Sequence, residues 1–578
     1  MRIVLLDLGH TLEVDGILLP GAHHTLQALQ SMRVDGEPVR LALLSDYRMP
    51  DAINGVVEIV AEYVRLLEQL GIYEYFTPVD ERITLSTELG VFKPDPRLFR
   101  LAADKILPGV PYEQIAFVTE NRSHVTAARE LGMVGVQVRK PGSSNHLPTL
   151  PEVPALLAEA FDIPPPDPIG LDGPVRLARG RAAGANPGGG RSVSWVQLGE
   201  DVLLIAAGTE LGALSRTGPS VIPLEGKTPR REHLHVVRQK GRLFQRLHPS
   251  VDVLHDAGRF LVVDMSPDEV QLPDPHGHSH FEVTPFSENE VLFSVADMDA
   301  ARADPNPTIE APLDEFDSDR FRTDLEELVG IGTRHSMADG YNQALELARD
   351  RLNHYATRLQ PFTMPGGTST NLIADKPGTA SSNRDVVLVT AHLDSVNLED
   401  GPTAPAPGAD DNGSGAAGLI AIGRALRPLE LRHDVRLILF GGEEQGLHGS
   451  REYLAGLSPG ERQRIRAVLN MDMIGAQHGA QPGVLLESSP MALWLLRELT
   501  RAAATYTDLQ VQTSTHSFAS DHVSFLNAGI PAVLTIEAAD EQSEDFVHSS
   551  RDTLDRVDDQ LASAILRMNT AWIIDTVG

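Results

Sequence analysis

A stretch rich in proline and glycine divides the chain and limits how it can fold. It reads FDIPPPDPIGLDGP from Phe161 and AAGANPGGGRS from Ala182, and such a composition cannot bury a hydrophobic core. The chain has 578 residues, of which 42% are hydrophobic. It is therefore too long for one core but has enough apolar residues for several. We expect a multidomain α/β protein with a linker at residues 161–191.

The segments on either side of this linker differ in periodicity. Residues 1–160 alternate apolar runs such as LALL and IAFV with helical stretches, a pattern typical of a Rossmann-like parallel sheet with crossover helices. Residues 192–300 contain short apolar runs, among them VSWVQL, DVLLIAA and EVLFSV, which favours a small β-rich domain. Residues 301–578 form a third, α/β segment. Its first part has a helical face predicted from Leu345, Ala348, Leu352, Tyr355 and Leu359.

Composition excludes several classes of function. The chain has no cysteine, so any metal must be held by His, Asp or Glu, and disulfides and thiol nucleophiles are excluded. The formal net charge is -31, from 49 basic and 80 acidic residues, which disfavours nucleic acid and anionic membranes as partners. The apolar run before Asp7 is too short for a signal peptide or a membrane span. We expect a cytoplasmic protein.

Metal-ligating side chains follow four apolar runs of the third segment. The runs are DVVLVTAHLDS, VRLILFGGEEQG, IRAVLNMDMIG and AVLTIEA, and they lead to His392, Asp394, Glu443, Glu444, Asp472 and His548. Functional residues gather at the carboxyl ends of strands in α/β sheets, and zinc accepts imidazole and carboxylate ligands. Asp410, in the loop GADDNGSG, is the candidate bridge between two ions because glycine lets the backbone approach closely. Asp411 is expected to shape the loop, and an ordinary turn is the alternative.

The order of these motifs resembles that of a known family. TAHLDS, GADDNGSG, GGEEQGLHGS, NMDMIG, SDHVSF and VHSSRDTLD resemble the motif set of the dinuclear zinc aminopeptidases of the bacterial leucyl aminopeptidase and aminopeptidase Y type, over roughly residues 315–578. The resemblance implies a mixed central sheet and a cis peptide between Asp410 and Asp411. It also implies that two Zn²⁺ ions activate water to release the N-terminal residue of a peptide or peptide-like metabolite. The implied zinc ligands are His392, Asp410 as bridge, Glu444, Asp472 and His548, with Glu443 as general base and Asp394 orienting His392.

The first segment resembles a second family. LLDLGHTL, LALLSD, GVFKPDPRLF and IAFVTENRSHVTAARELGM resemble the four motifs of haloacid dehalogenase-like phosphohydrolases, over about residues 1–140. The resemblance implies Asp7 as nucleophile, Ser45 as phosphate-binding hydroxyl and Lys93 as charge-balancing amine. Gly9 replaces the usual second acid, and Glu120 and His124 replace the Mg²⁺-binding aspartates. We therefore expect a degenerate phosphatase with a structural or partner-binding role and no dependable Mg²⁺ site.

Several alternatives remain open at this point. The chain could be a bifunctional phosphohydrolase-peptidase, a glutaminyl cyclase-like aminoacyl transferase or a non-enzymatic interaction protein. The β-rich domain could limit access to the active site or mediate assembly, including a homo-oligomer. In HGHSH, alternate histidines start at His276, and we expect a solvated loop there in preference to a metal site.

Overall fold

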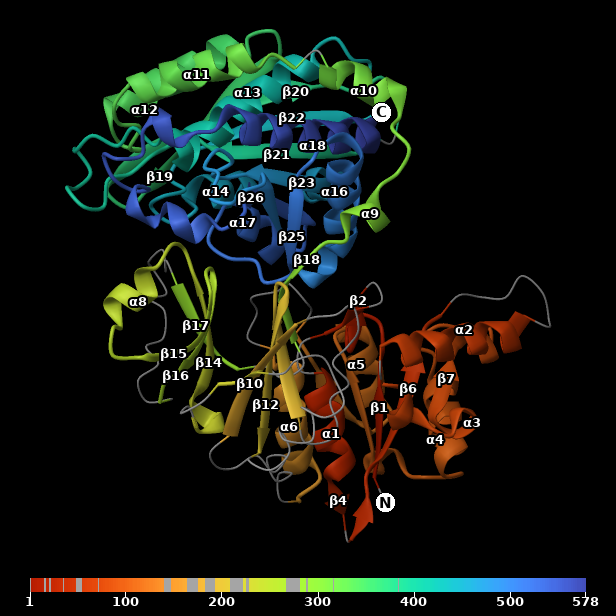
Figure 1. Ribbon diagram of the computed structural model, residues 1–578. Coiled ribbons are helices and arrows are strands. Elements are labelled where there is room, and N and C mark those ends of the chain that lie inside the picture. Colours follow the sequence, from red (N-terminus) through yellow and green to blue (C-terminus); the bar gives the residue numbers. More distant parts are fainter. Residues whose placement is uncertain are drawn as a thin grey trace.

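The computed structural model describes residues 2–14, 17–19, 22–34, 36–47, 55–70, 72–139, 147–163, 175–181, 193–207, 222–224, 228–266, 281–286, 290–314, 316–382 and 384–578. Figure 1 shows them as three regions along the chain. We call them the N-terminal region (residues 2–163), the middle region (175–295) and the C-terminal region (296–578).

The N-terminal region is built on a parallel sheet. Its strand order is β7-β6-β1-β8-β9, and all four residues of the central strand β1 are buried. The strands are β1 (Ile3–Leu6), β6 (Arg40–Ser45), β7 (Ile83–Leu85), β8 (Ile115–Thr119) and β9 (Val134–Gln137), and the main helices are α1 (Ala22–Ser31), α2 (Gly55–Gln69), α4 (Pro96–Ile106), α5 (Arg122–Glu130) and α6 (Val153–Ala160). Separate apolar clusters line the two faces of the sheet. This is the architecture that alternating apolar runs and helices predict.

The middle region consists mainly of antiparallel strands. β14 (Leu234–Gln239), β15 (Asp252–Ala257), β16 (Phe260–Asp264) and β17 (Phe281–Pro285) form one sheet in the order β15-β16-β14-β17. Its apolar face packs against the second layer, formed by β10 (Val175–Arg181), β11 (Val193–Leu198) and β12 (Asp201–Ala207). The short helix α8 (Leu243–Leu247) follows β14.

Strand β10 corrects the predicted linker, because it lies inside residues 161–191 and pairs with β12 over its whole length. Val175 and Leu177 are buried on one face of the strand, and Ala178 is buried on the other. The strand is short and flanked by stretches rich in proline and glycine, so the sequence gives little sign of it. Compact structure therefore begins at Val175 and not near residue 192.

The middle and C-terminal regions share one sheet. Within the described residues it contains thirteen strands, in the order β13-β10-β12-β11-β18-β25-β24-β26-β23-β21-β22-β20-β19. The junction is β18 (Glu290–Val295), which pairs with β11 on one side and with β25 (Gln510–Ser514) on the other. The remaining strands are β13 (Ile222–Pro223), β19 (Ala356–Met364), β20 (Gly367–Lys376), β21 (Val386–His392), β22 (Asp434–Phe440), β23 (Ile465–Met471), β24 (Gly483–Glu487) and β26 (Ala532–Glu537).

Helices cover both faces of the C-terminal part of this sheet. In Figure 1, α11 and α12 lie at the top of this region, and α14 and α17 lie lower, near β26. Helices α11, α12, α13, α16 and α18 contribute to the largest apolar cluster of the chain's described part, and α14 and α17 contribute to a smaller one around Phe440, Tyr453 and Phe525. The helices are α10 (Pro307–Asp314), α11 (Ser318–Gly330), α12 (Asp339–Arg351), α13 (Gly415–Leu426), α14 (His448–Ala455), α15 (Pro459–Arg464), α16 (Leu493–Tyr506), α17 (His522–Asn527) and α18 (Asp559–Val577).

The predicted helical face ends earlier than its spacing suggested. Leu345 and Ala348 are buried on α12, but the helix ends at Arg351. Leu359 lies instead on β19 and is 42% exposed, so the prediction for this residue is wrong. Hydrophobic spacing continued by coincidence past the helix end.

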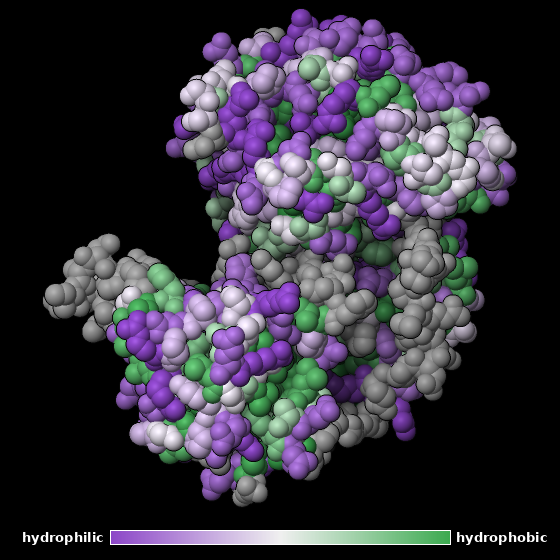
Figure 2. All heavy atoms as spheres, turned by 180° about the vertical axis from the view of Figure 1, so that it is seen from behind, coloured by the Kyte–Doolittle hydropathy of each residue, from purple (hydrophilic) through white to green (hydrophobic). Residues whose placement is uncertain are grey.

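The visible surface of the C-terminal region is largely hydrophilic (Figure 2). Figure 2 shows hydrophilic side chains over much of the visible face of the C-terminal region. No helix in the described part of the chain is long and apolar enough to cross a membrane.

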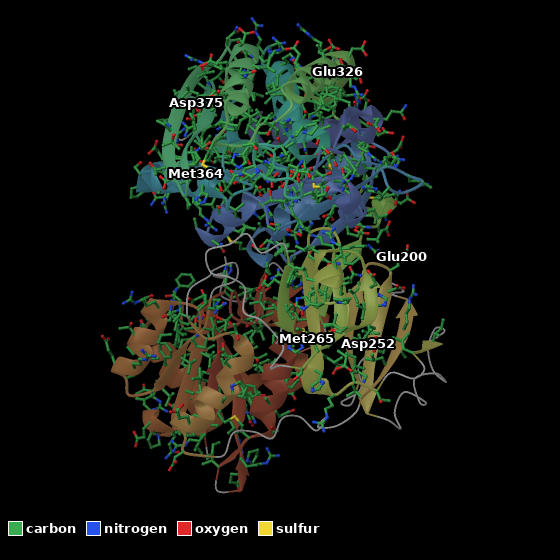
Figure 3. The ribbon with its side chains drawn as sticks, turned by 90° about the vertical axis from the view of Figure 1, so that its left-hand side faces the viewer. Glu200, Asp252, Met265, Glu326, Met364 and Asp375 are labelled. Atoms are coloured by element: carbon green, nitrogen blue, oxygen red, sulfur yellow. The ribbon has the colours of Figure 1, made fainter. Side chains whose placement is uncertain are left out.

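Arg259 joins the middle region to the C-terminal region. It follows the tip of the β15–β16 hairpin, and its guanidinium contacts Glu487 Oε2 at 3.0 Å and Asp540 Oδ2 at 2.7 Å. All three side chains are at most 4% exposed. In Figure 3 the labelled Asp252, at the other end of β15, lies farther from the C-terminal region than the labelled Glu200, in the β11–β12 turn. The hairpin tip is thus the end of this sheet that docks.

Replacing Arg259 with Met is expected to lower the free energy of unfolding by about 3–5 kcal/mol, because Glu487 and Asp540 would remain buried without their guanidinium. Urea unfolding followed by circular dichroism measures the change. Arg179→Met is a matched control, since Arg179 is 52% exposed and pairs with Asp201 on the surface, where such pairs contribute at most about 1 kcal/mol. Equal effects of the two substitutions would contradict the buried-pair interpretation.

Candidate metal centre

Four parallel strands bring the predicted ligands to one edge of the sheet. β21 ends at His392, and Asp472 directly follows the last residue of β23. Two glycines separate the end of β22 from Glu443 and Glu444, and His548 lies in the loop after β26. β22, β21, β23 and β26 are neighbours and run parallel, so their carboxyl ends coincide.

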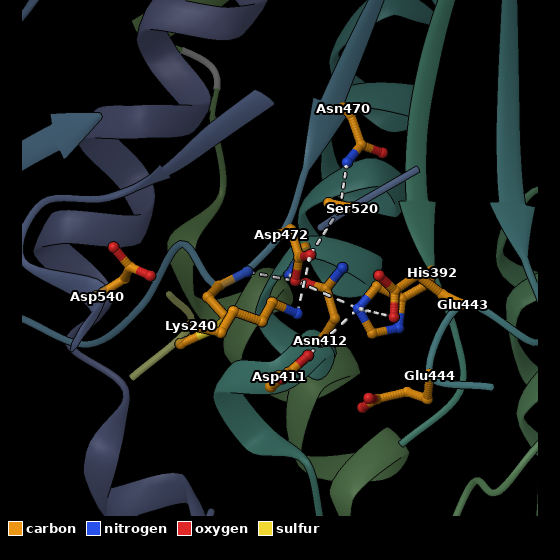
Figure 4. Close-up of polar contacts among 12 residues, drawn as sticks. Lys240, His392, Asp411, Asn412, Glu443, Glu444, Asn470, Asp472, Ser520 and Asp540 are labelled. Carbon is orange, nitrogen blue, oxygen red and sulfur yellow. Dashed lines mark hydrogen bonds and ion pairs between the residues drawn. The ribbon is translucent and has the colours of Figure 1, made fainter. Parts of the chain in front are cut away.

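Two groups of potential ligands share Asp411, and Figure 4 shows the one that contains His392 and Asp472. His392 Nε2 lies 3.2 Å from Asp411 Oδ1 and 3.2 Å from Asp472 Oδ1. His548 Nε2 lies 3.0 Å from Asp411 Oδ2 and 3.2 Å from Glu444 Oε2. Within each group the ligand atoms all lie within 4.8 Å of one another. The arrangement is that of two adjacent candidate cation sites that share one carboxylate.

The predicted bridge, Asp410, is not in either group, and the structure places Asp411 between the histidines instead. Asp410 Oδ1 accepts a hydrogen bond from Gly475 N at 3.0 Å. Burial and the neighbouring Glu537 carboxylate raise the pKa of Asp410 well above its usual value. The cis peptide also lies one residue later than predicted, between Asp411 and Asn412. The sequence-based assignment of the two aspartates is therefore corrected: Asp411 faces the ligands and Asp410 faces away from them.

Distant residues fix the conformation of this loop. Asp552 accepts hydrogen bonds from Asp410 N at 2.9 Å and from Asp411 N at 3.0 Å. The fully buried Arg334 donates to Pro407 O and Gly408 O. Gly408 has φ +51, and a Cβ there would lie 2.5 Å from Asp411 O. Asp552 belongs to the motif VHSSRDTLD, which could have indicated it, whereas no sequence signal marks Arg334.

Asp394 supports both His392 and the Glu443–Glu444 turn. Its carboxylate lies 3.6 Å from His392 Nδ1, and its main-chain oxygen is closer, at 3.2 Å. The same carboxylate accepts hydrogen bonds from Glu443 N at 3.4 Å and Glu444 N at 3.3 Å. The Asp394 carboxylate thus holds the turn that carries Glu443, while the main-chain oxygen of Asp394 makes the closer contact with His392. Its predicted role in orienting His392 stays a prediction.

The side chain of Glu443 lies beside the two groups without belonging to either. It is 1% exposed, and its Oε2 is 4.0 Å from His392 Nε2. Burial raises the pKa of Glu443 well above its usual value, and the positive charges of Lys240 and His392 oppose the rise. A buried carboxylate with a raised pKa is suited to accept and return a proton.

The donor set fits metal ions better than it fits hydrogen bonds alone. A histidine Nε2 carries at most one proton, yet His392 Nε2 faces two carboxylates at the same distance. Both oxygens of Asp411 are buried and accept no hydrogen bond within the described residues. Burial alone would lower the pKa of His392, but Asp472 and Glu443 raise it well above the usual value. Divalent cations would neutralise this excess of negative charge, and nitrogen with carboxylate oxygen is a ligand set of zinc.

Comparison with known proteins agrees with this geometry. Residues 371–573 match Peptidase family M28. The C-terminal region therefore contains an M28 peptidase domain, and we call residues 371–573 the M28 domain. Aminopeptidase YwaD of Bacillus subtilis (strain 168) is 30% identical over 222 residues, which cover 38% of this chain and 47% of that protein. Leupeptin-inactivating enzyme 1 of Streptomyces exfoliatus is 32% identical over 217 residues, which cover 36% and 45%. The chain thus spans about half the length of these curated relatives.

Solved structures resemble the M28 domain more weakly. A zinc aminopeptidase from Bacillus subtilis aligns with 45% of this chain and 95% of its own, at 18% sequence identity and a TM-score of 0.41. A glutaminyl cyclase from Porphyromonas gingivalis aligns with 45% of this chain and 99% of its own, at 21% identity and a TM-score of 0.39. Neither similarity is high enough to decide between the aminopeptidase and the glutaminyl cyclase reaction.

The N-terminal region brings three of its four predicted site residues together. Lys93 Nζ lies 2.5 Å from Asp7 Oδ2, and Thr119 Oγ1 donates to the same oxygen and also to Glu120 Oε2. Ser45 instead contacts the hydroxyl of Tyr63 at 2.7 Å. The haloacid dehalogenase-like assignment, the loss of activity and the weak Mg²⁺ site all stay predictions, as does cytoplasmic location. HGHSH lies outside the described residues.

Proposed function

We propose that the M28 domain is a zinc aminopeptidase that hydrolyses the N-terminal residue of peptides or peptide-like metabolites. The observation that carries the proposal is the sharing of Asp411 by two ligand groups, one with His392 and Asp472 and the other with Glu444 and His548. Relatives named aminopeptidases support the same reaction. The middle and N-terminal regions would assist this activity, and the M28 domain would carry it.

In the proposed reaction the protein's own groups orient the substrate and move the proton. Two bound Zn²⁺ ions would supply an activated water and polarise the scissile carbonyl. Glu443 would accept the proton from that water and transfer it to the leaving amine. Asp394 would keep His392 in the tautomer that presents Nε2 to the cation. Asp552 would hold Asp411 between the histidines through its two hydrogen bonds.

The purified full chain is expected to bind two zinc ions and to cleave peptides with a free N-terminus. Aminoacyl anilides and short peptides should be hydrolysed, and their N-acetylated forms should not. A chelator should abolish cleavage because it competes with the protein's ligands for the zinc ions, and added Zn²⁺ should restore cleavage. Metal analysis and chromatography of the products measure these outcomes.

Two results would redirect the proposal. Equal cleavage of free and acetylated peptides would leave a metallopeptidase that does not select chain ends. Loss of ammonia from peptides with N-terminal glutamine, without release of an amino acid, would favour the cyclase. A protein that binds no zinc and cleaves nothing would favour an interaction role.

A further inference from the structure

A lysine from outside the M28 domain reaches the candidate metal centre. Lys240 follows the last residue of β14 in the middle region, far in sequence from the M28 match at residues 371–573. Its side chain is 12% exposed, and its Nζ lies 4.0 Å from Asp472 Oδ2. Figure 4 shows it approaching Asp472 from the side opposite His392 and Glu443. It is therefore a cation placed at the centre by a different part of the chain.

The loop that carries Lys240 is held in place by the docking contact. Gln239 N donates to Arg259 O at 2.9 Å, and the fully buried Gln239 side chain donates to Gly258 O at 3.0 Å. Arg259 is in turn bound to Glu487 and Asp540 of the C-terminal region. Arg238, two residues before Lys240, donates to Ser517 O of the same region at 3.2 Å. The ends of β14 and of the β15–β16 hairpin thus form one rigid edge facing the centre.

A pocket lies between this edge and the metal centre. Its volume is about 250 Å³, and its walls include Lys240, Leu243 and Arg246 from the middle region and Leu398, Asp411 and His548 from the M28 domain. This volume is slightly below the range of about 300–1,000 Å³ that is usual for small-molecule pockets. The space therefore suits a small substrate. The middle region forms one wall of the space in which such a substrate would react.

The geometry around Lys240 indicates what it would contact. Bound divalent cations would draw on the negative charge of the proposed ligands Asp411, Glu444 and Asp472. The Lys240 Nζ lies 4.0 Å from Asp472 Oδ2, which is longer than a hydrogen bond. A lysine ammonium has three protons to donate. An anionic oxygen on the substrate is the group that would complete its contacts.

We propose that Lys240 is a catalytic residue of the M28 centre that donates a hydrogen bond to an anionic oxygen of the bound substrate. The oxygen is either that of the reacting carbonyl, which gains negative charge during hydrolysis, or that of a substrate carboxylate. In either case the middle region is part of the active site and supplies a group from outside the M28 domain. This inference rests on the proposed function.

Replacing Lys240 with Met in the zinc-loaded full chain tests the proposal. Loss of one such donor typically lowers turnover about 10²–10³-fold. Arg242→Met is the matched control, because Arg242 lies on the same loop, is 51% exposed and pairs with Asp256 at 3.6 Å. Four measurements are needed: kcat and KM for a dipeptide and for its C-terminal amide, the Kd of a dipeptide-like phosphinate, zinc content and thermal stability. Lys240→Arg should recover part of any loss.

The two sources of the oxygen give different results. A fall in kcat for both substrates with weaker phosphinate binding identifies the reacting carbonyl. A rise in KM for the free acid alone identifies a substrate carboxylate. Unchanged kinetics and phosphinate affinity would overturn the proposal, as would losses that parallel those of zinc or thermal stability. If the wild-type chain hydrolyses neither substrate, the proposed function fails, and the phosphinate affinities of wild type and variant still decide the role of Lys240.

Discussion

Replacing Glu443 with Gln is expected to lower turnover by about 10²–10⁴-fold while the protein keeps its zinc. Glu443 is buried beside the centre, but neither ligand group needs it. Glutamine has nearly the same shape and leaves the main-chain hydrogen bond from residue 443 to Asp394 intact, yet its amide cannot take a proton from water. Steady-state kinetics at saturating substrate and metal analysis of the same preparation measure the two effects.

A control for this substitution is available at the rim of the pocket. Glu399 lines the pocket described above, is about half exposed and forms an ion pair with Arg551. Glu399→Gln should retain turnover close to that of the wild type. Near-normal turnover of Glu443→Gln with full zinc content would exclude Glu443 as the general base.

Replacing Asp411 with Asn is expected to remove zinc from both sites, whereas Asp410→Asn should keep it. Asp411 alone belongs to both ligand groups, and an amide offers one neutral oxygen where the carboxylate offers two charged ones. Asp410 instead accepts a hydrogen bond from Gly475 N beside Glu537, where burial raises the pKa of both carboxyls. An asparagine there resembles the protonated acid. Zinc content and residual hydrolysis of the two variants measure the difference.

This pair of variants separates the structural assignment from the sequence-based one. The two residues are adjacent, buried and alike in chemistry, so each is the other's matched control. Retention of zinc by Asp411→Asn together with loss by Asp410→Asn would restore Asp410 as the bridge.

Much of the M28 domain could be predicted from the sequence, because its signals are local. Buried strands read as continuous apolar runs, and the residues after them stand at the sheet edge whatever the details of packing. The sequence therefore predicts His392, Glu444, Asp472 and His548 as ligands, and all four belong to the two candidate ligand groups. The runs at β11, β12 and β18 were recognised in the same way.

Features that depend on their context are poorly predicted by the sequence. The sequence predicts a linker at β10 because stretches rich in proline and glycine surround a strand of seven residues. It predicts a helix at Leu359 because the spacing of this residue continues that of α12. The continuity of the sheet through β18 was not predicted, because strand neighbours far apart in the chain leave no local pattern.

The sequence by itself determined the types of the candidate ligands, their order along the chain and the sheet edge at which they meet. Only the tertiary structure decided which of two adjacent aspartates faces the histidines, because Asp552 and Arg334 set the backbone of that loop from distant segments. It alone also placed Lys240 beside Asp472. Both depend on contacts between segments far apart in sequence, whereas a sequence pattern records only the preferences of neighbouring residues.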